Sequence, residues 1–248
     1  MIIFFLLLIL LGLSGGWLVN YLADVLPTTR SLERPACQTC GAQLSWADYL
    51  FFRRCATCQS PRKRRAYVVQ FLMAACTVYL WFLPPHRLEF PFALILFYYL
   101  ALVAVIDIEH RLILHIVSLV GALSGLGIGF YRQGLIPTLL GGAAGYAIML
   151  VFYFFGEVFA KTMAKRRNEP MDEVALGFGD VNLAGITGLL LGWPVIIYGL
   201  LFTILAGGVV SLFIVASMLV RRQYRAFMAI PYAPFLILSV LVLMFRPY

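Results

Sequence analysis

Long apolar runs separated by short polar stretches constrain this sequence more than any other feature. The chain has 248 residues, of which 62% are hydrophobic and only 12% are charged. Soluble domains are typically about half apolar and about a quarter charged. A run of about 20 apolar residues is long enough to cross a bilayer as a helix. The sequence therefore predicts an all-α integral membrane protein in a lipid bilayer.

Eight segments meet or approach this length, and each is predicted to be a transmembrane helix. Proline and glycine separate several of them, as expected at helix boundaries. The first run lacks the basic start of a signal peptide and stays apolar beyond the length of one, which favours a membrane helix. The predicted spans are residues 2–26, 66–83, 90–107, 112–131, 134–159, 178–193, 195–220 and 227–246.

The basic residues predict the orientation of the chain. If eight spans alternate in direction, 16 of the 19 Lys and Arg residues fall on one side of the membrane. Cytoplasmic loops carry such an excess, so this side is predicted to be cytoplasmic and both termini to lie outside. Because the basic residues lie between apolar segments, the net charge of +8 is interpreted as an orientation signal, and no nucleic-acid partner is expected.

These patterns predict three parts of the chain. Residues 1–26 are the first transmembrane helix, residues 27–65 form a cytoplasmic loop, and residues 66–248 form a seven-helix membrane core. A second polar segment, residues 160–176, has mixed charge and few apolar anchors and is predicted to be mobile. In the first helix, Asn20 and Asp24 lie four residues apart on one face, which is either an interfacial polar end or a face turned toward a site.

The cytoplasmic loop contains two Cys-x-x-Cys pairs, separated by fourteen residues. Four thiolates in two such pairs can occupy the corners of a tetrahedron, the geometry that structural zinc prefers. Two disulfides are the competing interpretation, but cytoplasmic thiols are kept reduced. The loop is therefore predicted to be a zinc knuckle, whereas Cys76, inside the second span, is interpreted as a packing residue. The predicted ligands are Cys37, Cys40, Cys55 and Cys58.

Two acidic residues lie at the predicted cytoplasmic ends of membrane spans. Asp180 begins the sixth span, where burying a carboxylate in a bilayer costs about 3 kcal/mol and is usually functional. Asp107 ends the third span, 73 residues earlier, at the same predicted depth. Two carboxylates that share a site cannot both ionise freely, so one can hold a proton while the other takes one from water. The alternative is that Asp107 only caps the interface and that Asp180 lies in an ordinary helix-entry turn.

In order and spacing, these features resemble the type IV prepilin peptidases, membrane aspartic proteases of the Gly-x-Gly-Asp class. The string Gly177-Phe178-Gly179-Asp180 carries the resemblance, with Asp107 at the end of an earlier helix and the four cysteines in the first loop. Gly16, Asn20 and Pro27 in the first helix, and the stretch from Pro231 to Phe235, extend it over nearly the whole chain.

The resemblance implies that Asp107 and Asp180 are the catalytic pair and that Gly177 and Gly179 let the substrate backbone approach Asp180. It implies an endopeptidase of the bacterial inner membrane that removes the leader of prepilins or pseudopilins just after a glycine, working with pilus or type II secretion machinery. Many family members also methylate the new N-terminus with S-adenosylmethionine.

The sequence departs from the family pattern at several positions. Leu114 and His115 stand where a Pro-Asp pair is usual, and Asn182 replaces a Lys. Trp17 follows Gly16 where Ser is common. After the second cysteine pair, Tyr67 and Gln70 replace a Pro and a Glu. The loss of the Glu weakens the expectation of methyl transfer more than that of proteolysis. Two alternatives from other classes are a proton-coupled transporter, which leaves the cysteines unexplained, and a non-catalytic scaffold for pilus assembly.

Overall fold

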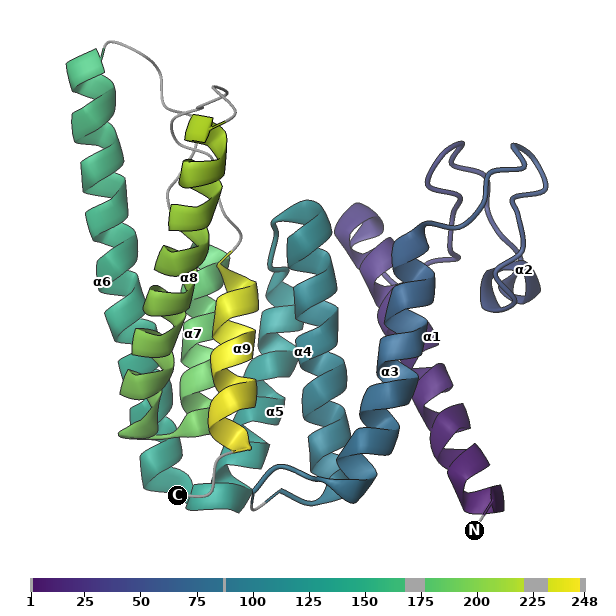
Figure 1. The fold of residues 1–248 in the computed structure, drawn as a ribbon, viewed down its shortest axis with the longest axis horizontal. Coiled ribbons are helices and arrows are strands. Elements are labelled where there is room, and N and C mark those ends of the chain that lie inside the picture. The colour runs from purple at the N-terminus through teal and green to yellow at the C-terminus, as the bar shows by residue number, and fades with distance from the viewer. Residues whose placement is uncertain (1, 87, 168–176, 221–231, 246–248) are drawn as a thin grey trace. The chain divides into compact units, whose positions relative to one another are not determined.

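The computed structural model describes residues 2–86, 88–167, 177–220 and 232–245. Within these ranges the chain forms nine helices and no named strand (Figure 1). They are α1 (Ile2–Thr29), α2 (Trp46–Leu50), α3 (Arg64–Phe82), α4 (Phe90–His110), α5 (His115–Gln133), α6 (Leu135–Arg167), α7 (Phe178–Leu191), α8 (Val195–Val220) and α9 (Ala233–Met244).

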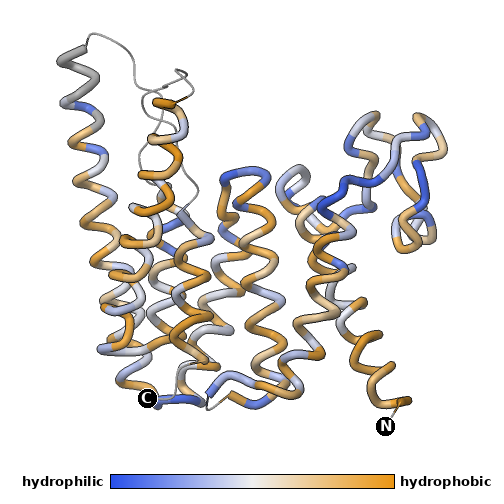
Figure 2. Tube along the Cα trace, viewed as in Figure 1, coloured by the Kyte–Doolittle hydropathy of each residue, from blue (hydrophilic) through white to orange (hydrophobic). Residues whose placement is uncertain are grey.

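The predicted all-helical membrane fold is confirmed. By length and composition, α1, α3, α4, α8 and the Leu135–Phe159 part of α6 can each cross a membrane, and α7 and α9 are apolar but shorter. Figure 2 shows apolar residues along these helices and hydrophilic residues gathered in the α1–α3 loop and near helix ends. Together with α5, these helices correspond in order to the eight predicted spans, and α2 is an additional short helix inside the cysteine-bearing loop.

Most predicted boundaries lie within a few residues of the observed ones, and the main difference is at the end of α6. This helix continues to Arg167, beyond the predicted end at residue 159. Lys161 forms an ion pair with Glu157 one turn earlier, at 2.7 Å, and such i,i+4 pairs stabilise exposed helix. Residues 168–176, where the predicted mobile segment continues, and 221–231, where the eighth predicted span begins and Pro231 lies, are outside the described residues.

By its internal contacts the chain forms two units, Met1–Ile106 and Asp107–Tyr248, here called the N-terminal and C-terminal units. In the N-terminal unit α1 packs closely along α3. Gly12 allows this approach, since a Cβ atom there would lie 2.6 Å from the Cα of Ala74. Tyr98 of α4 donates a hydrogen bond to the Leu11 carbonyl at 3.1 Å. This packing supports the loop of residues 30–63, the Cys loop. The predicted three-part division of the chain stays a prediction.

The C-terminal unit contains α5 to α9, and the closest helix packing in it involves α6 and α7. A Cβ atom added to Gly141 or Gly145 of α6 would collide with the backbone of α7, and one added to Gly188 would collide with α6. Small residues allow membrane helices to approach in this way. The α7 helix ends before Gly192, whose φ of 74° is the left-handed conformation that glycine adopts readily at helix C-termini. This packing fixes the start of α7, where Asp180 lies.

Candidate functional site

The four predicted ligand cysteines lie together in the Cys loop. Their sulfur atoms are all within 4.8 Å of one another, with Cys37 Sγ 3.6 Å from Cys58 Sγ and Cys40 Sγ 3.7 Å from Cys55 Sγ. In a tetrahedral site with metal–sulfur bonds of about 2.3 Å, neighbouring sulfurs are about 3.8 Å apart. All five cysteines of the chain are free thiols. The sulfur positions therefore fit a tetrathiolate metal site.

The two Cys-x-x-Cys segments form the same turn. Gly41 donates its backbone N–H to the Cys37 carbonyl at 2.8 Å, and Gln59 donates to the Cys55 carbonyl at 2.9 Å. Both donors have positive φ, 73° for Gly41 and 54° for Gln59. Backbone hydrogen bonds, first that from Cys40, lower the pKa of Cys37 to about 5. This favours the thiolate at Cys37, the form of cysteine that binds metals. The pKa of Cys40, despite the backbone hydrogen bond from Ala42, is raised to about 12 by its hydrogen bond with Cys58.

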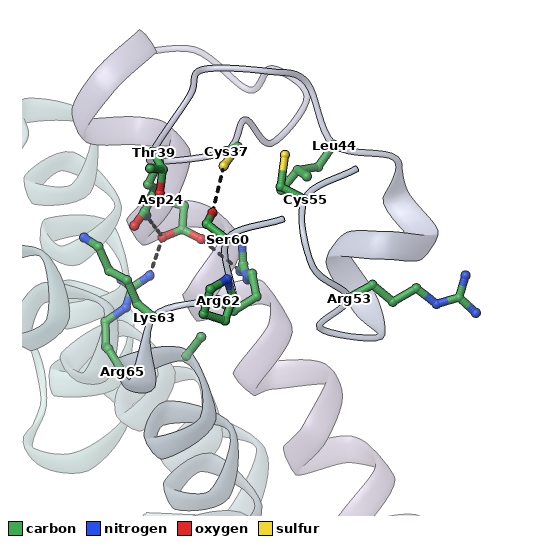
Figure 3. A pocket seen from close by; sticks show the side chains of 13 residues that line it. Asp24, Cys37, Thr39, Leu44, Arg53, Cys55, Ser60, Arg62, Lys63 and Arg65 are labelled. Carbon is green, nitrogen blue, oxygen red and sulfur yellow. Dashed lines mark hydrogen bonds and ion pairs between the residues drawn. The ribbon is translucent and has the colours of Figure 1, made fainter. Parts of the chain in front are cut away.

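A buried carboxylate connects the Cys loop to the membrane helices. The Asp24 side chain is only 4% exposed and accepts hydrogen bonds from Arg62 at 3.1 Å, Tyr49 at 2.7 Å and Gln38 at 2.6 Å, with a further bond from Arg65. Figure 3 shows Arg62 and Arg65 pointing toward Asp24 beside a cavity of about 110 Å³. We call these five residues the Asp24 hub.

Two further contacts strengthen the hub. The Arg62 guanidinium lies 4.0 Å from the centre of the Tyr49 ring, a cation–π distance. Burial raises the pKa of Tyr49, so its hydroxyl stays protonated and donates to Asp24. The hub therefore links the end of α1, both halves of the Cys loop and the start of α3.

The Asn20–Asp24 face of α1 is turned toward α3 and the Cys loop. The Asn20 amide donates to the Ala66 carbonyl of α3 at 3.0 Å and is 1% exposed. One turn further along α3, Gln70 donates to the Leu13 carbonyl at 2.6 Å. At the position where the family resemblance predicts a Glu, the chain thus has an amide that joins α3 to α1.

In the C-terminal unit, Asp107 and Asp180 each lie at a helix end. Asp107 is in the last turn of α4 and 5% exposed, and among the described residues its Oδ2 atom has no hydrogen-bond partner. Asp180 is the third residue of α7, and one of its oxygens accepts the Gly177 N–H at 3.2 Å.

Both acids line one cavity of about 300 Å³, together with Gly177 and Gly179. Part of the cavity wall comes from residues 111–113 of the segment that joins α4 to α5. Gly179 lets this segment approach, because a Cβ atom there would lie 2.8 Å from Ile113 Cβ. The four residues that the sequence predicts for this site are thus brought together. We call this space the Asp cavity.

The Asp cavity also contains residues that the sequence analysis did not assign to it. His115 and Asn182 line it, although the sequence marked them only as departures from a family pattern. Arg111, with a φ of 51°, lines it too, and its backbone N–H bonds the Asp107 carbonyl at 2.8 Å. The position of Arg111 directly after an acidic helix end was the one signal for its role.

Residues 94–212 match the model of the "Type IV leader peptidase family". The match includes Asp107, Gly177, Gly179 and Asp180, and it runs from α4 into α8. This part of the chain is similar to the type IV leader peptidase family. The Cys loop lies outside the match.

Two proteins are similar to most of this chain, and both are named "Prepilin leader peptidase/N-methyltransferase". The one from Myxococcus xanthus (strain DK1622) is 28% identical over 226 residues, which cover 85% of this chain and 63% of the relative. The one from Legionella pneumophila is 28% identical over 225 residues, which cover 86% of this chain and 72% of the relative. The chain thus spans 63% of the length of the first of these relatives. No solved structure matches the chain.

Proposed function

We propose that this protein is a membrane aspartic endopeptidase that removes the leader of type IV prepilins or pseudopilins. The observation that carries the proposal is the Asp cavity, in which two carboxylates from separate helices line one space. The family match over residues 94–212 supports the same reaction. Prepilin-type proteins are the proposed substrates, and pilus or type II secretion machinery is the proposed setting.

In the proposed reaction one carboxylate holds a proton and the other is ionised. The ionised carboxylate takes a proton from a water molecule as the water oxygen attacks the carbonyl carbon of the scissile bond. The protonated acid gives its proton to the carbonyl oxygen. When the resulting diol collapses, the C–N bond breaks and the leaving amine receives a proton. Among the described residues the buried Oδ2 atom of Asp107 has no hydrogen-bond partner, so it can bond the water or the substrate carbonyl once the side chain turns into the Asp cavity.

We assign the Cys loop a structural zinc ion, held by Cys37, Cys40, Cys55 and Cys58. The donor set favours this metal, because four thiolates at tetrahedral spacing are typical of structural zinc. Bound there, the ion would supply folding energy to a loop that has few buried residues of its own. No catalytic step passes through it.

We propose the bacterial inner membrane as the location, with the Cys loop and the Asp cavity on the cytoplasmic side and both termini outside. The distribution of Lys and Arg supports this orientation. Labelling of single cysteines placed at the N-terminus and in the Cys loop, in whole cells and in inverted vesicles, tests it. Equal accessibility of both sites from outside would contradict the orientation.

Methyl transfer from S-adenosylmethionine to the new N-terminus is a second candidate activity. The names of both relatives include it, and each alignment covers at least 85% of this chain. A mass gain of one methyl group on the mature product, seen only with S-adenosylmethionine, is the expected result. Leader removal without that gain would assign proteolysis alone to this chain.

Cleavage by the purified full-length chain tests the main proposal. The substrate is a prepilin with its leader, incorporated in the same detergent micelles or vesicles, and mass spectrometry records leader loss. Asp107→Asn and Asp180→Asn are expected to lower the cleavage rate by about 10²- to 10⁴-fold. Glu109→Gln is the matched control, because Glu109 lies two residues after Asp107 and does not line the Asp cavity.

Full cleavage by either Asp variant would contradict the proposal. If the parent cleaves no substrate but carries protons in vesicles, and the Asp variants lose that transport, the transporter interpretation holds. An inactive parent that binds assembly proteins through the Cys loop would support a scaffold.

A further inference from the structure

A second, larger cavity lies in the C-terminal unit. Its volume is about 390 Å³, and its walls come from α5, α6 and α7. Ligand pockets in proteins usually have volumes of about 300–1,000 Å³, so this space can receive a peptide segment. We call it the α5–α7 cavity.

The α5–α7 cavity adjoins the Asp cavity. His115, the first residue of α5, and Asn182, near the start of α7, line both spaces. Since the starts of both helices lie at the Asp cavity, α5 and α7 run away from it in the same direction. An occupant that extends from the two carboxylates therefore follows these helices into their apolar parts.

The residues along the two helices repeat the same spacing. On α5 the lining residues are 115, 118, 119 and 122, and on α7 they are 182, 185, 186 and 189. Each set follows i, i+3, i+4, i+7, which is one face of a helix. Each face begins with a polar side chain at the Asp cavity and continues with apolar or small residues. The cavity thus changes from polar to apolar with distance from the two carboxylates.

One polar atom interrupts the apolar part of this face. Ser118 is 9% exposed and, among the described residues, its hydroxyl has no hydrogen-bond partner. A buried hydroxyl without a partner costs about 1–3 kcal/mol. A ligand atom that bonds to it would remove that cost.

We propose that the α5–α7 cavity binds the apolar segment of the substrate that directly follows the scissile bond. This inference rests on the proposed peptidase function and identifies where its substrate lies. An apolar membrane segment matches the gradient of the walls, with its first peptide bond at the carboxylates and its side chains between α5 and α7.

Ser118 has a specific part in this arrangement. The first four N–H groups of a helix have no partner within the helix, and in an apolar surrounding each unpaired group is costly. In this arrangement the substrate helix begins next to the scissile bond, so its first-turn N–H groups lie near the polar start of the α5–α7 cavity. The Ser118 hydroxyl, which is buried in the structure, turns toward the cavity and accepts one of them, as serine does at helix N-termini.

Ala122 gives the sharpest test, because it lies one turn beyond Ser118 and has a small side chain. Ala122→Phe fills the cavity, and Leu123→Phe, at a neighbouring position that is 64% exposed and does not line the cavity, is the control. The substrates are prepilins that carry Leu or Ala at each of the first three positions after the scissile bond, changed one at a time.

For the parent, kcat/KM is expected to be higher with Leu than with Ala at one or more of these positions. Ala122→Phe is expected to lower that Leu-to-Ala ratio at least about tenfold, the range that one or two methylene groups determine in an apolar pocket. Leu123→Phe should keep the parent's ratio. Ser118→Ala should lower kcat/KM about five- to tenfold for both substrates and leave the ratio unchanged.

An unchanged ratio in Ala122→Phe overturns the proposal and indicates that the cavity holds lipid acyl chains instead. If Ala122→Phe does not fold, Leu119→Ala, which enlarges the cavity, replaces it. In Leu119→Ala the ratio of kcat/KM for a substrate with a bulkier residue such as Phe to that for the Ala substrate should rise. An unchanged ratio in this variant would also overturn the proposal. Loss of cleavage in the parent itself would instead contradict the peptidase function. The two failures are thus distinguishable.

Discussion

Two buried carboxylates in this protein have opposite surroundings. The Asp24 side chain in the N-terminal unit is 4% exposed and Asp107 in the C-terminal unit is 5% exposed. Asp24 accepts hydrogen bonds from four side chains, two of which are guanidinium groups. Among the described residues, Asp107 Oδ2 has no hydrogen-bond partner, and it lines a cavity with a second carboxylate.

The difference separates a structural carboxylate from a reactive one. A buried charge is costly unless it is paired and hydrogen-bonded. At Asp24 the cations offset that cost, so the carboxylate can hold the Cys loop to α1 and α3. At Asp107 no hydrogen bond to Oδ2 among the described residues offsets the cost, and Arg111 is a cation that lines the same cavity. Burial of an acid is therefore a weaker indicator of catalysis than burial of an acid without partners.

Metal removal is expected to have the largest effect on stability, and this effect is expected only in the Cys loop around Asp24. Binding of zinc by four thiolates contributes on the order of 10 kcal/mol to folding in small zinc domains. A chelator, or Cys40→Ser, should therefore unfold the Cys loop, measured as faster hydrogen exchange of residues 30–63. Cys76→Ser, a change of the one cysteine outside the cluster, is the control. Exchange that stays slow after metal loss would show that the hub alone holds the loop.

Asp107→Asn is expected to affect activity and leave stability intact. Removing a catalytic acid or base lowers the rate by about 10²- to 10⁴-fold. The amide also avoids burying a charge that lacks hydrogen bonds, so the midpoint of thermal unfolding should be unchanged or higher. Cleavage and unfolding are measured on the same preparation. A lower midpoint with retained cleavage would reverse the assignment of the two carboxylates.

The same change at Asp24 is expected to do the opposite. Asp24→Asn leaves two largely buried guanidinium groups without their counter-charge, and breaking a buried pair costs about 3–5 kcal/mol. The unfolding midpoint should fall and the cysteines should react faster with a thiol reagent. Asp48→Asn is the control, since its 3.8 Å pair with Arg53 is exposed and such pairs contribute about 1 kcal/mol or less. Equal effects at positions 24 and 48 would show that the Asp24 hub contributes no more to stability than the Asp48–Arg53 ion pair.

The sequence predicted the features that depend on local pattern. Apolar length predicted eight helices, and the two Cys-x-x-Cys pairs predicted that the four thiols gather at one site. The side of the membrane assigned from Lys and Arg brought Asp107 and Asp180 to one depth, and the structure places both on one cavity.

The features that depend on tertiary contacts could not be predicted in this way. The donors to Asp24 lie 14 to 41 residues away, and nothing in the order of the residues pairs them. The helical spacing that lines the α5–α7 cavity is visible in the sequence, but it is equally typical of a packed helix face. Only the unpartnered Ser118 hydroxyl and the shared residues His115 and Asn182 distinguish a binding space from a core.

The smallest predicted effect separates the two glycines of the Gly-x-Gly-Asp string. A Cβ atom at residue 179 would lie 2.8 Å from Ile113 Cβ, whereas one at residue 177 has 3.5 Å to Asp180 Oδ2 as its nearest contact. Overpacking costs about 1–3 kcal/mol. Gly179→Ala should therefore lower both the unfolding midpoint and the cleavage rate, because the new methyl group displaces Ile113 and the segment that joins α4 to α5.

Gly177→Ala should cost less than about 1 kcal/mol, as expected for a changed helix N-cap with room for a methyl group. Unfolding and cleavage of the two variants are compared with the parent. Suppose that Gly177→Ala loses cleavage at full stability while Gly179→Ala retains cleavage. The substrate backbone then approaches at residue 177, and cleavage does not depend on the tight packing at residue 179. The opposite result would mean that Gly179 serves the Asp cavity through Ile113, by holding the wall that keeps the unpaired carboxylate in place.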